Sequence, residues 1–425
     1  MIDGKNDYLS KKEERKMKAV THANVFDGNN DRLINNATIV IENNLVKEIT
    51  QEAVSTDGFE NVIDAGGRTV IPGLIDAHTH VSSPKYRDAD RVDEAVVGGV
   101  VNAKFLLEHG FTSVRDAGGI TYGLKQGIDR GIIEGPRIFP SNSPISQTTG
   151  HSDARTSKAE FRITDGIYTS GRLMSRRGAL ADGEAEVLRA TREQFFLGAS
   201  QIKIMAGGGV ASSNDPIQTV QFSLNEMKAI VGAAKDYGTY VMAHLYTTEA
   251  INRALDAGVR SLEHAQLVDE ETAKRVADSG AYICACPNFA VKPPAFIWDS
   301  PIRRPKYELV KTGEDRQAEL INKYNIKLLY GTDGVGRQLE DIPRFVERFG
   351  SYKTLKAATG TFNEIVKLTT YHNPYPLGKV GVLEAGSYAD FLVIEGNPLE
   401  DANILTDVDN IKVIAKDGVV YKNTL

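Results

Sequence analysis

Alternating apolar and polar residues mark both ends of the chain. The segment "TIVIENNLVKEI" reads as a β-hairpin that turns at Asn43-Asn44. Near the other end, "ADFLVIEGNP" reads as a strand, and "IKVIAKDGVVYKN" reads as a hairpin that turns at an Asp-Gly pair. Two β-rich segments separated by a long stretch of different pattern predict one small β-sandwich domain, built from residues 17–70 and 378–425 together.

Between these segments the pattern changes to short apolar runs that alternate with amphipathic helices. Stretches such as "LNEMKAIVGAAKDYG" and "TEAINRALDAG" have helical periodicity, and the second ends at Gly258, as helices commonly do. Eight apolar runs are expected to be strands: "LIDAHTH", "FTSVRDAGG", "RIFPSN", "QIKIMAGG", "TYVMAHLY", "RSLEHAQL", "YICACP" and "KLLYGTDG". Eight strands, each followed by a helix, predict an α/β fold with a (β/α)8 TIM barrel over residues 71–377.

Composition narrows the class of protein without changing this picture. The chain has 425 residues, of which 41% are hydrophobic and 25% charged, as in ordinary globular proteins. A net charge of −6 without a basic stripe argues against nucleic acid as a partner, and no apolar run approaches the ~20 residues of a membrane span. Cys284 and Cys286 share one face of an expected strand, where buried thiols are favoured over zinc binding. With so few cysteines and no apolar secretory signal, a cytoplasmic location is expected.

Polar and ionisable residues gather at the ends of the predicted strands. His78 and His80 lie two positions apart, so they project from one face of a strand, where two imidazoles can hold one metal ion. Lys203 lies between two isoleucines, and an unpaired lysine is costly to bury, so we expect it to be neutralised, paired or chemically modified. The candidate metal ligands, drawn from five strands, are His78, His80, Lys203, His244, His264 and Asp333.

These residue types make chemical sense as one site. Imidazoles and carboxylates bind transition-metal ions, and a lysine carboxylated by CO2 would be an anionic bridge between two of them. A metal ion makes water a nucleophile at neutral pH, and Asp333 could take the proton of that water and deliver it to a leaving group. Taken singly, His264 could be a hydrogen-bonded core histidine, Asp333 a turn residue and Lys203 the partner of a buried carboxylate. Their joint occurrence, in order, at strand ends favours the metal centre.

The motifs "PGLIDAHTH", "IKIMAGGG", "MAHLYT", "SLEHA" and "GTDG", with the ending "GSYADFLVIEGNPL", resemble those of the amidohydrolase superfamily of metal-dependent hydrolases. The chain looks most like its imidazolonepropionase-like and prolidase-like branch, which includes Xaa-Pro and Xaa-Arg dipeptidases, N-acyl amino acid hydrolases and ochratoxin-hydrolysing amidases. The resemblance implies a homo-oligomer and a site for two divalent metal ions, usually zinc. It assigns His78, His80 and Asp333 to the more buried ion, His244 and His264 to the second, and a carboxylated Lys203 to the bridge.

Three further residues are candidates by the same resemblance. His151, in the loop "TTGHSD", is similar to a histidine that polarises the scissile carbonyl; the alternative is a surface loop histidine. Tyr246 is similar to a tyrosine that binds the free α-carboxylate of a substrate, and Arg253 is a weaker candidate for that task. The stretch "LTTYHNPYPLG" and the Pro-rich loop near Trp298 depart from the family pattern and leave the substrate open.

The expected function is therefore hydrolysis of an amide or peptide bond in a small molecule with a free carboxylate, such as a dipeptide, an N-acyl amino acid or an ochratoxin-like amide. A second hypothesis keeps the fold but assigns a cyclic amide, a lactone or a phosphotriester as the substrate. A third, a non-catalytic relative that serves as a binding or assembly protein, is disfavoured because all the metal-ligand positions are retained.

Overall fold

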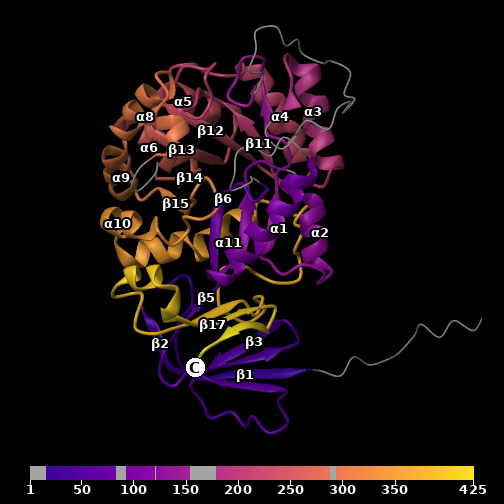
Figure 1. The fold of residues 1–425 in the computed structure, drawn as a ribbon, viewed down its shortest axis with the longest axis vertical. Helices are drawn as coiled ribbons and strands as arrows, with labels where there is room; N and C mark the ends of the chain where they lie inside the picture. The colour runs from indigo at the N-terminus through magenta and orange to yellow at the C-terminus, as the bar shows by residue number, and fades with distance from the viewer. Residues whose placement is uncertain (1–15, 83–91, 120, 154–178, 288–292) are drawn as a thin grey trace, which may run out of the picture.

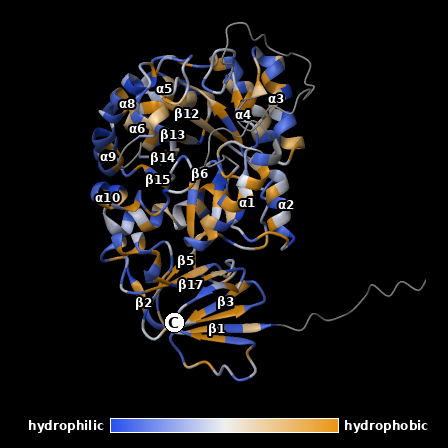
Figure 2. Ribbon diagram, viewed as in Figure 1, coloured by the Kyte–Doolittle hydropathy of each residue, from blue (hydrophilic) through white to orange (hydrophobic). Residues whose placement is uncertain are grey.

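The computed structural model describes residues 16–82, 92–119, 121–153, 179–287 and 293–425. Figure 1 shows two parts: the middle of the chain forms a body of helices around short strands, and both chain ends meet in a β-rich part beneath it. Figure 2 shows apolar residues concentrated on the strands, whereas the outer helices carry many hydrophilic residues. The buried apolar residues of these strands, together with those of the helix faces that pack on them, form the core.

Strands from both ends of the chain share one sheet of eight strands, in the order β18-β17-β16-β5-β1-β2-β3, with β4 paired to β1. They are β1 (Met17–Phe26), β2 (Leu33–Glu42), β3 (Leu45–Thr50), β4 (Asn61–Asp64), β5 (Thr69–Pro72), β16 (Phe391–Ile394), β17 (Ile411–Lys416) and β18 (Val419–Asn423). Both predicted hairpins are present, with β2 joined to β3 through Asn43-Asn44 and β17 joined to β18 through an Asp-Gly pair. Val20 and Val393, from opposite ends of the chain, belong to one buried cluster. Sandwich packing and the domain boundaries stay predictions.

All eight predicted strands of the middle of the chain are present and pair in parallel. They are β6 (Leu74–Thr79), β7 (Phe111–Asp116), β8 (Arg137–Pro140), β11 (Ile202–Met205), β12 (Val241–Thr247), β13 (Ser261–Leu267), β14 (Tyr282–Ala285) and β15 (Lys327–Tyr330), with short strands β9 (Ile145–Ser146) and β10 (Ala179–Leu180). Two sheets result, β6-β7-β8 and β10-β9-β11-β12-β13-β14-β15. Backbone hydrogen bonds bridge them at both edges, from Asp333 N to His78 O at 2.8 Å and from Ser200 N to Pro140 O at 2.7 Å.

Local sequence signals place the helices that surround these strands. Helix α4 begins with a capping box formed by Ser223 and Glu226, and α5 ends at Gly258, whose φ of 91° is left-handed. Met227 of α4 and Ile251 of α5 pack into the same core cluster as the strands. The helices are α1 (Val92–Glu108), α2 (Tyr122–Asp129), α3 (Glu184–Phe196), α4 (Leu224–Asp236), α5 (Thr248–Ala257), α6 (Glu270–Ser279), α7 (Ala295–Trp298), α8 (Arg303–Lys311), α9 (Glu314–Lys323), α10 (Ile342–Ala357), α11 (Gly360–Val366), and the 3-10 turns Ala402–Thr406 and Val408–Asn410. Over the described ranges, none of them has the length and apolar character to cross a membrane.

Candidate metal centre

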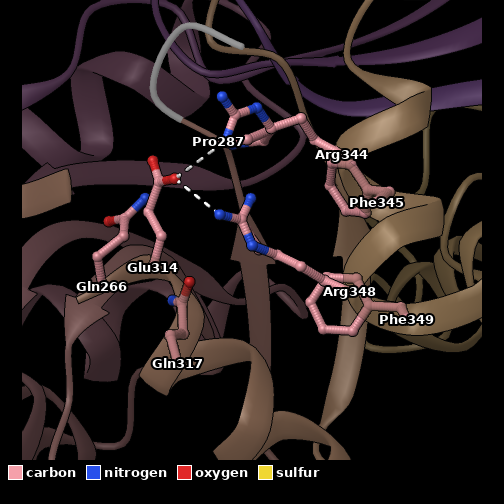
Figure 3. Close-up of a pocket in the computed structure, with 9 residues that line it drawn as sticks. Gln266, Pro287, Glu314, Gln317, Arg344, Phe345, Arg348 and Phe349 are labelled. Atoms are coloured by element: carbon pink, nitrogen blue, oxygen red, sulfur yellow. Dashed lines mark hydrogen bonds and ion pairs between the residues drawn. The ribbon is translucent and has the colours of Figure 1, made fainter. Parts of the chain in front are cut away.

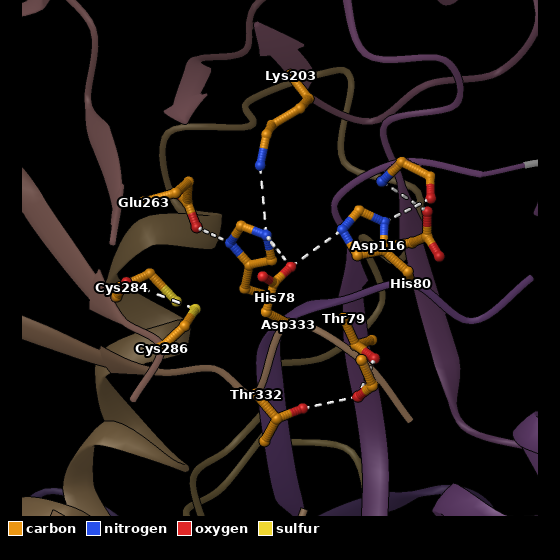
Figure 4. A network of polar contacts seen from close by, with 12 residues as sticks. His78, Thr79, His80, Asp116, Lys203, Glu263, Cys284, Cys286, Thr332 and Asp333 are labelled. Atoms are coloured by element: carbon orange, nitrogen blue, oxygen red, sulfur yellow. Dashed lines mark hydrogen bonds and ion pairs between the residues drawn. The ribbon is translucent and has the colours of Figure 1, made fainter. Parts of the chain in front are cut away.

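The carboxyl ends of five parallel strands bring the predicted metal ligands together. The ring centroids of His78 and His264 are 4.9 Å apart, and those of His244 and His264 are 4.7 Å apart. Lys203 reaches the same place from β11, with Nζ 3.3 Å from His78 Nε2 (Figure 4). The strand ends thus form one continuous cluster of ligand-type side chains.

His78 in β6 and His80, directly after the end of β6, both present Nε2 to Asp333. The Asp333 Oδ1 atom lies 3.4 Å from His78 Nε2 and 3.2 Å from His80 Nε2. On the other side of each ring, His78 Nδ1 lies 2.6 Å from Glu263 Oε2, and His80 Nδ1 lies 2.8 Å from the Gly118 carbonyl oxygen. These acceptors favour a proton on Nδ1, which leaves the Nε2 lone pair for a metal ion. The ligand atoms of His78, His80 and Asp333 lie within 4.8 Å of one another.

Two buried imidazole nitrogens of the cluster have no hydrogen-bond partner in the part of the chain that the structure describes. They are His244 Nε2 and His264 Nδ1. Unpaired buried polar atoms are rare, because each has lost its hydrogen bonds to water. Burial lowers the pKa of both histidines well below the usual value, so both rings are neutral. Neutral imidazoles are the form that binds metal ions, and the residues present therefore fit a divalent cation.

The backbone leaves regular strand geometry where the ligands emerge. Glu263 and His264 are neighbours on β13, yet both contact His78, although consecutive strand residues ordinarily face opposite ways. The φ of His264 is 73° and that of Asp333 is 57°, in the left-handed region that costs a non-glycine residue about 1–3 kcal/mol. Gln317 Nε2 donates to the His264 carbonyl and helps to hold this conformation. The left-handed backbone conformation turns the His264 ring toward the cluster.

Lys203 is buried in β11, and its surroundings favour the uncharged amine. Burial lowers its pKa, although the nearby carboxylates of Glu263 and Asp333 act in the opposite direction. No carboxylate of the described residues forms an ion pair with it, so the predicted alternative of a paired lysine is not observed. The uncharged amine is the form of lysine that reacts with CO2.

A buried ion pair that the sequence reading missed lies beside His78. Arg115 Nη2 lies 3.0 and 3.1 Å from the two carboxylate oxygens of Glu263, and both side chains are fully buried. Arg115 Nη1 also donates to Ser261 Oγ at 3.0 Å and Tyr240 OH at 3.2 Å. Burial raises the pKa of Glu263, but Arg115 and His78 outweigh it and keep this carboxyl ionised. Opposite charges inside "FTSVRDAGG" and "RSLEHAQL" were the signal that could have identified the pair.

Cys284 and Cys286 are buried free thiols near the same histidine (Figure 4). Their sulfur atoms and a ring nitrogen of His78 lie within 4.8 Å of one another. The predicted burial of both thiols is confirmed, and this spacing also fits the zinc-binding alternative.

His151 lies directly against the histidine cluster. Its ring stacks on that of His244, with centroids 4.1 Å apart and planes 3° apart. Its Nδ1 lies 3.0 Å from Oδ2 of Asp215, a buried residue that the sequence did not single out. The structure thus places His151 beside the predicted ligands rather than on a free surface loop.

The two candidates for carboxylate binding are placed differently. Tyr246 is buried, and its ring stacks on His264 with centroids 5.2 Å apart. Arg253 Nη1 instead donates to the Phe222 carbonyl at 2.8 Å, and no contact joins it to the histidines in the described chain. The structure therefore brings Tyr246, but not Arg253, to the site.

A small pocket lies beside the site, between α9, α10 and the ends of β13 and β14 (Figure 3). Glu314 pairs there with Arg348 at 3.1 Å and with Arg344 at 4.0 Å. Gln317, which also lines the pocket, is the residue that holds the His264 carbonyl. We assign the Gln317 contact to support of the strand end.

Fold and site together are those of a metal-dependent hydrolase. The model of the Amidohydrolase family matches residues 69–422, so the chain belongs to the amidohydrolase family.

Individual relatives agree with this assignment. Ochratoxinase from Aspergillus niger is 28% identical over 415 residues, covering 92% of this chain and 83% of its own length. Imidazolonepropionase from Rhizobium rhizogenes is 24% identical over 321 residues, covering 67% of this chain and 71% of its own. The crystal structure of a prolidase complexed with N-methylphosphonate-L-proline has a TM-score of 0.87 at 32% identity, covering 96% of this chain and 100% of its own. The predicted family branch and hydrolysis of amide bonds are thereby confirmed.

Proposed function

We propose that this protein is a binuclear metal amidohydrolase built on a closed (β/α)8 barrel. The observation that carries the proposal is the proximity of the six predicted ligands, among which His244 Nε2 and His264 Nδ1 are buried and unpaired within the described residues. The backbone hydrogen bonds that bridge the two parallel sheets support barrel closure. Membership of a generally metal-dependent family supports the metal centre.

The ligand assignment follows the two halves of the cluster. His78, His80 and Asp333 would hold one divalent ion, and His244 and His264 would hold the other. A carboxylated Lys203 would be a ligand to both, and zinc is the expected metal. With ions bound, these residues would supply a site that polarises a carbonyl oxygen and lowers the pKa of water.

In this proposal Asp333 transfers a proton, and His151 stabilises the negative charge of the oxyanion. Asp333 takes the proton of the attacking water and delivers it to the amine that leaves. Burial raises the pKa of Asp333, but the neighbouring imidazoles of His78 and His80 hold it well below the usual value, so this carboxyl begins as a base. Its side chain is 39% exposed, which lets water and substrate reach it. His151 is the proposed donor from Nε2 to the oxyanion, and its Nδ1 lies 3.0 Å from Asp215 Oδ2.

The proposed substrate is a small amide whose leaving residue has a free carboxylate. The names of the relatives, an ochratoxinase and a prolidase complexed with a phosphonate of proline, support this class. Tyr246, stacked on His264, is the candidate that binds the carboxylate.

A substrate screen with metal analysis tests the proposal. Protein reconstituted with Zn2+ and bicarbonate is assayed on ochratoxin A, L-Met-L-Pro and N-acetyl amino acids, beside a hydantoin, a lactone and paraoxon. We expect about two zinc ions per chain and turnover of at least one carboxylate-bearing amide. Zinc far below one per chain would overturn the metal centre, and turnover confined to the comparison compounds would favour the second hypothesis.

A further inference from the structure

Asp215 is a buried carboxylate that concentrates three hydrogen bonds on one oxygen. Its side chain is 1% exposed and belongs to the loop that follows β11. Its Oδ2 accepts from His151 Nδ1 at 3.0 Å, from Gly209 N at 2.8 Å and from Gln221 Nε2 at 3.3 Å. This oxygen therefore fixes the His151 ring relative to the surrounding loop.

The ring of His151 has little freedom in this setting. It stacks in parallel on His244, and its backbone N–H donates to Gln221 Oε1 at 2.9 Å. Gly209 packs directly against it, since a Cβ at Gly209 would overlap the imidazole atoms. A rotation of the ring would therefore break the bond to Asp215 and collide with its neighbours.

Lys306 of helix α8 holds the loop that carries Asp215. Lys306 Nζ donates to the carbonyl oxygens of Gly209 at 3.0 Å, Ser212 at 3.1 Å and Asp215 at 2.5 Å. The same ammonium lies 3.7 Å from Asp215 Oδ1, so it also neutralises the buried charge. The carboxylate is thus held in place by groups other than His151.

We infer that Asp215 is the positioning residue of His151, holding the ring at the metal centre with Nε2 directed to the substrate. The inference rests on the proposed function, in which His151 donates to the reacting carbonyl. A carboxylate that accepts from one ring nitrogen fixes the orientation of the other, as partners of metal-binding histidines do. Small misplacement of a catalytic group can reduce a rate about hundredfold.

A double-mutant cycle tests whether Asp215 acts through His151. D215N is nearly isosteric, and on the best substrate among ochratoxin A and L-Met-L-Pro we expect it to lower kcat about 10- to 100-fold with KM changed less than about threefold. H151A should have a comparable effect, and D215N should slow the H151A protein less than about twofold further. In NMR spectra of the imidazole nitrogens, D215N should shift the His151 signals even without substrate.

The matched control is R303M, which removes the bond from Arg303 Nε of α8 to the Ala211 carbonyl of the same loop, at 2.9 Å, and leaves the contacts of Asp215 and His151 in place. Its kcat should stay within about threefold of wild type. If D215N slows the H151A protein as much as it slows wild type, or leaves the His151 signals unmoved, the inference is wrong while the proposed function stands. If H151A keeps the wild-type rate, the role of His151 in the proposed function is wrong, and the inference falls with it. Should D215N fail to fold, D215E, which keeps the charge but shifts the carboxylate, takes its place in the same cycle.

Discussion

Replacing Glu263 with glutamine perturbs the ring of His78 from the side opposite to the metal centre. Glu263 accepts from His78 Nδ1 at 2.6 Å, from Ser261 Oγ at 2.6 Å and from Arg115 through both carboxylate oxygens. Glutamine offers one acceptor oxygen, and its amide NH2 group is a donor. In either orientation of the amide, Arg115 therefore meets a donor, and its buried charge loses its counter-ion.

This geometry predicts the size of two effects of E263Q, one on folding stability and one on metal affinity. Breaking a buried ion pair by neutralising one partner costs about 3–5 kcal/mol of folding free energy. Loss of the carboxylate behind a metal-binding histidine weakens metal affinity about 10- to 100-fold, because the ligand becomes less basic and less well oriented. E263Q should therefore unfold at lower urea concentration and bind zinc more weakly, two effects that can be measured separately.

E314Q is the control, because Glu314 is also a buried carboxylate paired with an arginine, and it belongs to helix α9, which carries none of the six proposed ligands. Zinc affinity is measured by competition with a chromophoric chelator, and stability by urea unfolding of the metal-free proteins. We expect both variants to lose stability, and E263Q alone to lose zinc affinity. Equal zinc affinity in E263Q and wild type, or the same loss in E314Q, would refute the assignment of Glu263 to the metal centre.

Three further changes test other parts of the structure. D333N should lower kcat at least about 100-fold, because the proton acceptor is lost, while elemental analysis still finds bound zinc; a near-normal rate contradicts the acid–base role. Y246F should raise KM several-fold for substrates with a free carboxylate and little for their amidated analogues, and an unchanged KM would exclude Tyr246 from carboxylate binding. Burial raises the pKa of the Asp341 carboxyl to about 7. The folded protein therefore holds the carboxyl proton more tightly than the unfolded chain does, and folding stability is lost as the pH rises toward 7. D341N should therefore raise Tm more near pH 8 than near pH 5, and an equal gain at the two pH values would show that this carboxyl does not titrate as expected.

The strands and the ligand positions could be read from the sequence because each depends on local pattern. Apolar runs of strand length, bounded by turn residues, locate the eight parallel strands, and the chemistry appears where each run ends. His78 and His80 face the same side because side chains two positions apart in an extended segment do so, independently of tertiary contacts. The hairpins at both chain ends followed from turn residues between alternating segments in the same way.

The residues that orient the ligands could not be read in this way. Asp215 and His151 are far apart in sequence, and their contact exists only because the loop after β11 folds back over the strand ends. Glu263 and Arg115 look like charges on exposed strand faces until the strands are brought together. Strand periodicity also predicts that His264 points away from Glu263, and the left-handed backbone at His264 reverses that expectation.

The histidines of the site fall into two groups according to the contacts of their ring nitrogens. In His78, His80 and His151, Nδ1 is occupied by a fixed acceptor: a carboxylate, a backbone carbonyl and a second carboxylate. Each of these rings is oriented before any ligand binds, so the ring loses little conformational freedom when its Nε2 binds a ligand. His244 and His264 instead carry an unpaired buried nitrogen, which is tolerable only if something outside the described chain pairs with it. The protein thus combines three pre-oriented imidazoles with two that need a partner, and the proposed cation would pair with the second group without disturbing the first.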